Sequence, residues 1–383
     1  MFSCRKIVNS LLTSIRRERE REREREHARI LYVVNSLEHV GGVETRLRDQ
    51  FEYLAAHGIM PIVLCERNAC PSMFRYPLLQ MDYSAENAEE LLYELVALSG
   101  ADAVEFQLKS PRLFNSVNLS GLKQIARVGA CIHGETDVFP RQLLQTDYYF
   151  GTAPRAVLPK EALIIRNWIK MPRRTVSPSP ESRKALFVSR IDNEKFPTVK
   201  NFVSLCRACG FSFSIAGSIK SGDEVLHRKL QSLHLPPDAL AGPIETHAFL
   251  SAHGGEYAFV AGVGQVPLEA AAFGIPGMVI PHKDNWRLAT VLTEENFSFL
   301  REWNMVIKVC PDSDLLGNVE TFLEDRTRGD MKKYDLRELV RKNCSIDAAM
   351  AVYLDAVYGR SRSASGRLPA SSQKRSHSRE ALQ

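Results

Sequence analysis

The chain has 383 residues, a length that is too great for one ordinary hydrophobic core and fits two domains of common size. Hydrophobic residues make up 44% of it and charged residues 25%, a balance that excludes a largely disordered protein. The net charge of +5 is uneven, because residues 1–29 and 361–383 each carry +4 and residues 30–360 carry −3. An acidic body excludes a nucleic-acid platform, which needs a clustered positive surface, whereas the basic ends allow contact with an anionic membrane.

The two ends of the chain have low sequence complexity. Arginine and glutamate alternate from Arg17 to Glu26, which indicates a solvated, charged leader over residues 1–28 without the features of a signal peptide. The Ser/Arg-rich tail over 361–383 is expected to be disordered. Eight cysteines in a chain of this length are typical of reduced cytosolic thiols. The close pair, Cys206 and Cys209, is expected to be two ordinary thiols on a helix.

The first half of the chain alternates between strand and helix patterns. Residues 29–35 form a short apolar run that predicts a strand, and after a glycine pair apolar residues recur at helical spacing over 43–57. The apolar run 60–65 predicts the second strand of this unit. Weaker patterns continue in the order helix 87–98, strand 103–107, helix 118–125, strand 126–132, strand 147–150 and strand 163–165.

A polar stretch over 170–183 contains three prolines and predicts an interdomain linker. A second series follows it: strand 184–189, helix 198–210, strand 211–216, helix 222–233, strand 257–260, helix 268–273 and strand 277–281. Two such series predict an α/β protein with two doubly wound, Rossmann-like domains, over 29–169 and 184–335, which face a central cleft. The helical pattern at 336–360 is expected to form a C-terminal helix that packs across both domains.

Ligands of such sheets bind beyond the carboxyl ends of the strands. Gly262 and Gly264 follow a predicted strand and precede a helix, where glycine lets the backbone approach a phosphate beside the helix N-terminus. A third glycine is missing, so the dinucleotide-binding fingerprint is absent. Glu269 is a lone carboxylate in an apolar helix, and a ribose diol could supply the hydrogen bonds that its burial requires. The alternative is a first-turn glutamate favoured by the helix dipole.

Two cations, Arg190 and Lys195, come directly after the first strand of the second domain. In that position they can stabilise the negative charge that grows on a leaving nucleotide diphosphate, and no metal is needed for this. The alternative is surface salt bridging with Asp192 and Glu194, which is common and contributes little.

Two features of the first domain are expected to face the same cleft. Gly41 and Gly42 lie between the first strand and the first helix and could bring the backbone against the diphosphate, although a plain turn would have the same sequence. His133 follows the predicted strand 126–132 and could hydrogen-bond the sugar or an acceptor hydroxyl. A structural histidine is the alternative.

Together these motifs resemble those of the retaining glycosyltransferases of the GT-B fold, specifically glycosyltransferase family 4, over residues 29–358. The family's Gly-Gly-[Ala/Val]-Glu is similar to residues 41–44, and its Gly-Arg-Leu-x-x-x-Lys is similar to residues 189–195, with serine in place of the first glycine. Its Glu-x-Phe-Gly-x-x-x-x-Glu-Ala is similar to residues 261–270. Its Pro-Asn-Gly-[Ile/Val] matches residues 166–169 only at the asparagine and the isoleucine.

The resemblance implies an enzyme that transfers a sugar from a nucleotide-sugar donor to a hydroxyl acceptor held by the N-terminal domain. Retention at the anomeric carbon and a transition state with oxocarbenium character are implied as well. The family's second glutamate, which binds the nucleotide ribose, is present as Glu269, whereas Ala261 stands in place of the first, which engages the donor sugar. Arg190, Lys195 and the glycine-lined turn would hold the diphosphate, and His133 would orient the reacting sugar.

No cofactor and no metal are expected. Asp312 and Asp314 have the spacing of a metal-binding pair, but they precede a helical pattern and are expected to cap a helix. The acceptor is expected to be a saccharide or a lipid-linked glycan of cell-surface glycan synthesis, and the protein is expected to be cytoplasmic, at the inner face of the membrane. Two alternatives stay open: a nucleotide-sugar epimerase, and a degenerate, non-catalytic sensor or complex subunit, for which Ala261 and Trp168 are the motivation.

Overall fold

The computed structural model describes residues 28–37, 42–68, 75–108, 112–133, 141–152, 162–166, 168–219, 222–308, 311 and 313–359. The predicted tail and nearly all of the predicted leader lie outside these residues, and so do Gly41, Asn167 and Asp312. Within the described part, no helix has both the length and the apolar character needed to cross a membrane.

Residues 28–166, here called the first lobe, are built around a sheet of seven parallel strands in the order β3-β2-β1-β4-β5-β6-β7. The strands are β1 (Ala28–Leu37), β2 (Ile59–Asn68), β3 (Leu78–Gln80), β4 (Ala103–Leu108), β5 (Arg127–Ile132), β6 (Tyr148–Gly151) and β7 (Leu163–Ile164). The helical segments are α2 (Gly42–Ala56), α3 (Ala88–Ser99), α4 (Arg112–Ser116), α5 (Leu119–Leu122) and η2 (Arg141–Gln145).

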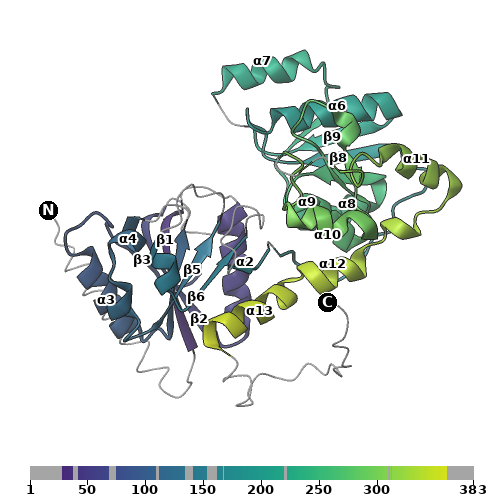
Figure 1. The fold of residues 1–383 in the computed structure, drawn as a ribbon. Coiled ribbons are helices and arrows are strands. Elements are labelled where there is room, and N and C mark those ends of the chain that lie inside the picture. Colours follow the sequence, from purple (N-terminus) through teal and green to yellow (C-terminus); the bar gives the residue numbers. More distant parts are fainter. Residues whose placement is uncertain are drawn as a thin grey trace, which may run out of the picture.

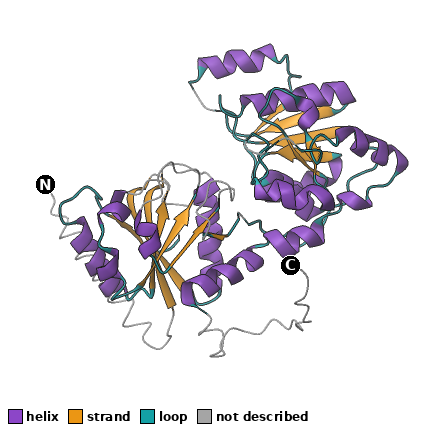
Figure 2. Cartoon of the chain, viewed as in Figure 1, coloured by secondary structure: helices purple, strands orange, loops and turns teal. Residues whose placement is uncertain are grey.

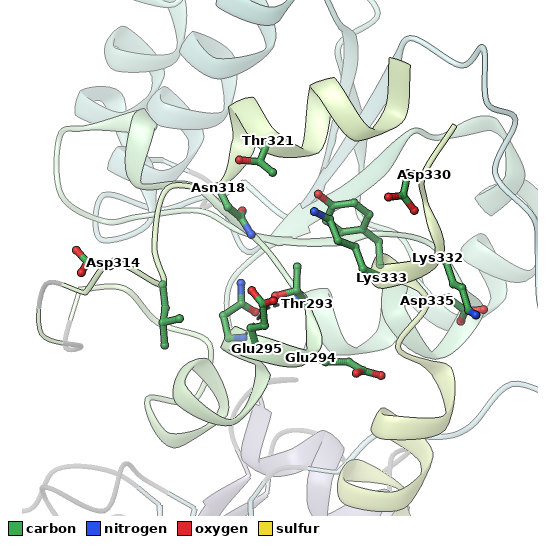
Figure 3. Close-up of a pocket in the computed structure, with 13 residues that line it drawn as sticks. Thr293, Glu294, Glu295, Asp314, Asn318, Thr321, Asp330, Lys332, Lys333 and Asp335 are labelled. Atoms are coloured by element: carbon green, nitrogen blue, oxygen red, sulfur yellow. Dashed lines mark hydrogen bonds between the residues drawn. The ribbon is translucent and has the colours of Figure 1, made fainter. Parts of the chain in front are cut away.

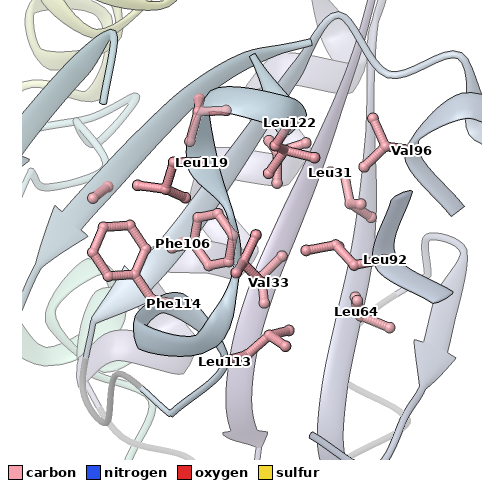
Figure 4. Packing of buried hydrophobic residues seen from close by; sticks show 14 of the residues in the cluster. Leu31, Val33, Leu64, Leu92, Val96, Phe106, Leu113, Phe114, Leu119 and Leu122 are labelled. Atoms are coloured by element: carbon pink, nitrogen blue, oxygen red, sulfur yellow. The ribbon is translucent and has the colours of Figure 1, made fainter. Parts of the chain in front are cut away.

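Both faces of this sheet are covered, which explains why its strands are nearly continuous apolar runs. Leu47, Phe51 and Leu54 recur on one side of α2 and are fully buried against one face. On the other face, Phe106 of β4 packs edge-on against Phe114 of α4, with ring centroids 5.1 Å apart. Figure 4 shows this second core, in which leucines of α3, α4 and α5 surround the strand side chains.

Residues 184–335, the second lobe, hold a six-stranded sheet in the order β10-β9-β8-β11-β12-β13, in which only β13 is antiparallel. The strands are β8 (Lys184–Val188), β9 (Ser212–Ala216), β10 (Leu240–Gly242), β11 (Phe259–Gly262), β12 (Gly277–Val279) and β13 (Thr290–Val291). The helical segments are α6 (Phe196–Cys209), α7 (Glu224–Ser232), α8 (Thr246–His253), η4 (Gly254–Glu256), α9 (Val266–Phe273), η5 (Trp286–Leu288), α10 (Glu294–Glu302), α11 (Val319–Arg328) and η6 (Lys332–Tyr334). Helices flank both sheets in Figure 2, so the predicted fold class of two doubly wound α/β units is confirmed.

The single C-terminal helix expected over 336–360 is in fact two helices, α12 (Arg337–Cys344) and α13 (Ile346–Tyr358). Ser345 interrupts them because its backbone is extended, with ψ 153°, and its hydroxyl caps the start of α13 through the amide of Ala348. The break redirects the chain, so that α12 packs on α9 of the second lobe and α13 enters the core of the first. Figure 1 shows the two helices one after the other, α12 beside the second lobe and α13 beside the first.

Some shorter elements differ from expectation. The helix expected over 118–125 has only the one turn of α5, because the chain turns again directly after it toward β5. The sequence pattern did not predict β3, β10 and β13, each of which has two or three residues, or the helices α4, α8, α10 and α11. Strands this short carry too few residues for an alternating pattern to be recognised.

Candidate active site at the strand ends of the second lobe

Three neighbouring strands of the second lobe end at the same edge of the sheet. β11 lies between β8 and β12 and runs parallel to both, and Gly262 is in register with Val188 and with Val279. The segments that leave these strand ends are residues 189–195, 263–265 and 280–283. The fold therefore brings the predicted Arg190–Lys195 segment and the glycine turn to one edge, which is where ligands of open α/β sheets bind.

Lys195 reaches across this edge to a histidine that the sequence analysis missed. Its Nζ atom lies 3.4 Å from Nε2 of His282, which follows β12, and its side chain is only 20% exposed. Burial, followed by the charges of Lys195 and Lys308, lowers the pKa of His282 to about 4. His282 is therefore neutral at physiological pH and can accept a hydrogen bond from the ammonium group. Its place directly after a strand was the available sequence signal.

Arg190 is more exposed than Lys195 and already has partners in its own loop. Its Nε atom lies 2.5 Å from Oδ2 of Asp192, and Nη2 lies 3.8 Å from a carboxylate oxygen of Glu194. The other oxygen of Asp192 accepts a hydrogen bond of 2.9 Å from the amide of Lys195, so this aspartate also shapes the turn. The salt bridging named as the alternative role is present for both cations, since Nζ of Lys195 also lies 3.5 Å from Oε1 of Glu194. Exposed ion pairs of this kind contribute little stability.

The glycine turn between β11 and α9 has two separate physical requirements. A Cβ atom on Gly262 would lie 2.9 Å from the carbonyl oxygen of Val188, so only glycine lets β11 approach β8 without a shift. Gly264 has φ +68°, a left-handed conformation that favours glycine. Its amide donates to the carbonyl of Met305 at 3.2 Å and is occupied. The amides of Gln265 and Val266 have no partner among the described residues, so the positive end of α9 is open at these two groups.

Glu269 lies on α9 where the two lobes meet. No described residue donates a hydrogen bond to its half-buried carboxylate, and Asp49 of α2 in the first lobe and Glu245 act on it as like charges. Burial, and after it these two carboxylates, raises the pKa of Glu269 to about 7. Four residues before it, Gln265 ties α9 to the segment that follows the first lobe, because its Nε2 atom donates to the carbonyl of Trp168 at 2.6 Å. A carboxylate without donors at such a junction is suited to bind hydroxyl groups of a ligand.

The first-lobe candidates lie at the corresponding edge of the other sheet. His133 directly follows β5, is half-buried, and its Nε2 atom lies 2.5 Å from Oε1 of Gln107. Gly42 is the first residue of α2. Ala261 lies in β11 with no exposed surface, within the core of the second lobe, so no acidic group is present at this position.

The structure does not support the helix cap expected at the Asp-x-Asp sequence. Asp314 lies in a turn, and the next helix, α11, begins only at Val319, with Asn318 at its N-cap position. No group of three or more His, Cys, Asp or Glu side chains suited to a metal occurs in the described ranges. Cys206 and Cys209 are free thiols on α6.

A pocket of about 660 Å³ lies elsewhere in the second lobe, among the starts of α10 and α11 and the segment around η6. Acidic side chains and two lysines line it, as Figure 3 shows. None of the predicted site residues is among them, and the pocket lies beyond β13, whose antiparallel direction takes the chain away from the carboxyl edge of β12.

Neither the protein-family models nor the curated proteins include a match to this sequence. Solved structures do resemble it. A glycosyltransferase from Rickettsia africae is 14% identical, with a TM-score of 0.58 over 87% of this chain and 99% of its own. Anabaena HepE in complex with UDP is 14% identical, with a TM-score of 0.60 over 86% and 100%. A protein of Listeria monocytogenes described as a UDP-N-acetylglucosamine 2-epimerase is 10% identical, with a TM-score of 0.52 over 86% and 95%. At such identities the likeness concerns the fold, and the fold of this chain is GT-B.

Proposed function

We propose that this chain is a glycosyltransferase, which moves a sugar from a nucleotide-diphosphate sugar to a hydroxyl acceptor with retention and without a metal. The observation that carries the proposal is Glu269, a half-buried carboxylate with no hydrogen-bond donor among the described residues, placed on the helix that begins at the strand ends. A ribose diol supplies two hydroxyl donors, which would offset the cost of this buried charge.

The diphosphate of the donor would lie between Lys195 and the start of α9. The free amides of Gln265 and Val266 and the ammonium group of Lys195 are donors to an anion at one sheet edge. Arg190 would join them by releasing Asp192 and binding a phosphate oxygen instead. The guanidinium group that donates to the carboxylate can donate to a phosphate in the same way. These groups would stabilise the charge that develops on the leaving diphosphate.

The first lobe would hold the acceptor. In the proposed reaction the bond between the anomeric carbon and the diphosphate breaks, the acceptor oxygen bonds to that carbon on the same face, and a diphosphate oxygen takes the acceptor proton. His133 would orient the sugar by hydrogen bonding. The acceptor would be a saccharide or lipid-linked glycan of the cell surface, reached at the inner face of the membrane through the basic terminal segments, 1–28 and 361–383.

A second candidate function is nucleotide-sugar epimerisation, favoured by the Listeria neighbour, which has the same architecture. A third is nucleotide-sugar binding without turnover, favoured by the absence of an acidic group at Ala261. All three functions use the same nucleotide site, and nucleotide binding alone does not separate them. They are told apart by the product: a glycosylated acceptor, an epimerised nucleotide sugar, or none.

Thermal unfolding with UDP, GDP, ADP and their sugars tests the nucleotide site. One base class should raise the unfolding temperature, because a ligand at one hundred times its Kd stabilises the folded state by ~2.7 kcal/mol. The Glu269→Gln variant should lose most of this shift for the nucleoside diphosphate and keep the response to inorganic pyrophosphate. Product analysis with the stabilising sugar then separates transfer or donor hydrolysis, epimerisation and binding alone. The nucleotide site is refuted if none of these nucleotides shifts the transition.

A further inference from the structure

A chain of buried hydrogen bonds leads inward from His133. Glu105 and Gln107 are two residues apart on β4, so they share one face of the sheet, and their exposed fractions are 0% and 3%. The Nε2 atom of Gln107 lies 2.5 Å from Oε1 of Glu105, and its Oε1 lies 2.5 Å from Nε2 of His133. The glutamine thus bridges the histidine after β5 and a carboxyl group in the interior of the first lobe.

Tyrosines from three other elements enclose this carboxyl group. The hydroxyl of Tyr148 on β6 lies 3.5 Å from Oε2 of Glu105, and the hydroxyl of Tyr353 on α13 is also hydrogen-bonded to it. Tyr353 meets Tyr32 of β1 at 2.6 Å, and Gln50 of α2 donates to Tyr32 at 3.0 Å. Burial raises the pKa of all three tyrosines well above the ordinary value, so their hydroxyls keep their protons at neutral pH.

Arg46 of α2 is the cation of this cluster. Its guanidinium carbon lies 4.4 Å from the ring centroid of Trp168, and its Nη1 atom donates to Sγ of Cys131 at 3.2 Å. Its charge favours the ionised form of Glu105 through space, whereas burial has the larger effect and raises the pKa of Glu105 to about 7. Two further titratable groups lie around the cluster: Tyr358, which acts on Tyr32 and Tyr148, and Arg127, whose guanidinium carbon lies 6.0 Å from the ring centroid of Tyr148.

The direction of these hydrogen bonds follows from the chemistry of the amide. The NH₂ group of Gln107 can only donate, so it faces the carboxylate of Glu105, and its carbonyl oxygen can only accept. The ring atom that meets this oxygen, Nε2 of His133, must then carry the proton. We propose that Glu105 and Gln107 are positioning residues, which hold the ring of His133 with a proton on Nε2 through this chain of hydrogen bonds. This proposal rests on the proposed function only in one respect, which is that His133 hydrogen-bonds the donor sugar.

Protonation of Glu105 would reverse the direction of the hydrogen bonds that link it through Gln107 to His133. A protonated carboxyl group donates its O–H to Oε1 of Gln107 after the amide rotates, and the NH₂ group then points to His133. Its Nε2 atom must accept in that state and cannot carry the proton. The charge of a buried glutamate thereby sets which ring nitrogen of His133 is a donor.

The test uses the full chain labelled with ¹⁵N-histidine at pH 8.5, where Glu105 is ionised. An imidazole proton that is held in a buried hydrogen bond exchanges slowly, so His133 should give an observable Nε2–H resonance, identified by its loss in His133→Asn. Gln107→Met keeps the volume of the side chain and should abolish this resonance. The matched control is Gln50→Met, a buried glutamine at the far end of the same cluster, which should retain it.

Glu105→Gln is the second variant. It removes the charge at nearly constant shape, so the pKa of His133, read from the ring shifts, should fall. A His133 resonance that survives in Gln107→Met, or an unchanged His133 pKa in Glu105→Gln, would overturn the proposal. Should Gln107→Met not fold, the Glu105→Gln titration decides alone. If the protein gives the expected resonances but shows no turnover, the positioning role stands and the proposed enzymatic function is refuted. If it shows turnover but lacks these resonances, the enzymatic function stands and the positioning role is refuted.

Discussion

Lys195 and His282 meet with Nζ and Nε2 3.4 Å apart, although the strands that precede them, β8 and β12, are separated by β11. An ammonium group only donates, so Nε2 of His282 accepts and the ring proton lies on Nδ1. That atom is buried without a hydrogen-bond partner among the described residues. The pair therefore links the segments that follow β8 and β12, the two strands on either side of the strand that leads into α9.

We predict that His282→Ala weakens nucleoside diphosphate binding about tenfold, because a hydrogen bond to a charged group contributes ~1.5–3 kcal/mol and the lysine keeps its charge. Lys195→Ala should weaken it further and reduce turnover by a factor of ~100 or more. The double variant should bind no more weakly than Lys195→Ala alone, since His282 acts through Lys195. Titration calorimetry measures all three, and additive losses would show that His282 acts independently.

Arg190 offers a test of whether its loop carboxylates compete with a ligand. Asp192→Asn removes the charge that pairs with Arg190 and keeps the oxygen that accepts from the Lys195 amide. We expect this variant to bind the nucleoside diphosphate more tightly and Arg190→Ala to lower turnover by orders of magnitude with the fold intact. Unchanged affinity in Asp192→Asn, together with normal turnover in Arg190→Ala, would leave the arginine a surface salt-bridge residue.

The pKa of Glu269 predicts a pH-dependent gain in stability for Glu269→Gln. Burial raises this pKa from 4.5 to about 7, so the folded protein disfavours the ionised form. Below pH 4.5 the carboxyl group is protonated in both states and the variant should match the wild type. The difference should grow as the pH rises toward 7 and reach on the order of 3 kcal/mol at pH 8. Urea unfolding at pH 4.5 and pH 8 measures it, and equal differences at the two pH values would contradict this prediction.

Gly277→Ala should destabilise the second lobe severely. The added Cβ atom would lie 2.1 Å from the backbone carbonyl oxygen of Pro267, so α9 must move away from β12. We expect a loss of ~3 kcal/mol or more, as in other overpacked cores. Gly210→Ala is the control, because no atom lies within 4 Å of its Cβ position and only its φ of +70° opposes the change, which should cost about 1 kcal/mol. Similar urea midpoints for the two variants would refute the steric argument.

The sequence predicted best those parts of the fold that depend on local pattern. The long strands and helices of each series were recognised because their apolar residues recur at fixed spacing, as in α2 and α6. The break at Ser345 was missed, since serine is compatible with a helix and here its extended backbone depends on a bridge to Ile169 in another part of the chain. In the site, Lys195 was named from its position after a strand and Glu269 as a lone carboxylate in an apolar helix. His282 also directly follows a strand, but only the fold shows that it meets Lys195.

The amino-acid sequence by itself determined the two α/β series, the glycine turn before α9 and the polar residues that follow strand ends, because these features arise from neighbours along the chain. Only the tertiary structure decided which of those residues meet. Parallel strand order places β8, β11 and β12 side by side, and this brings Lys195 to His282. Packing of α2 and α13 over β4 likewise encloses Glu105, and burial of this kind changes the pKa of a group without any change in its local sequence.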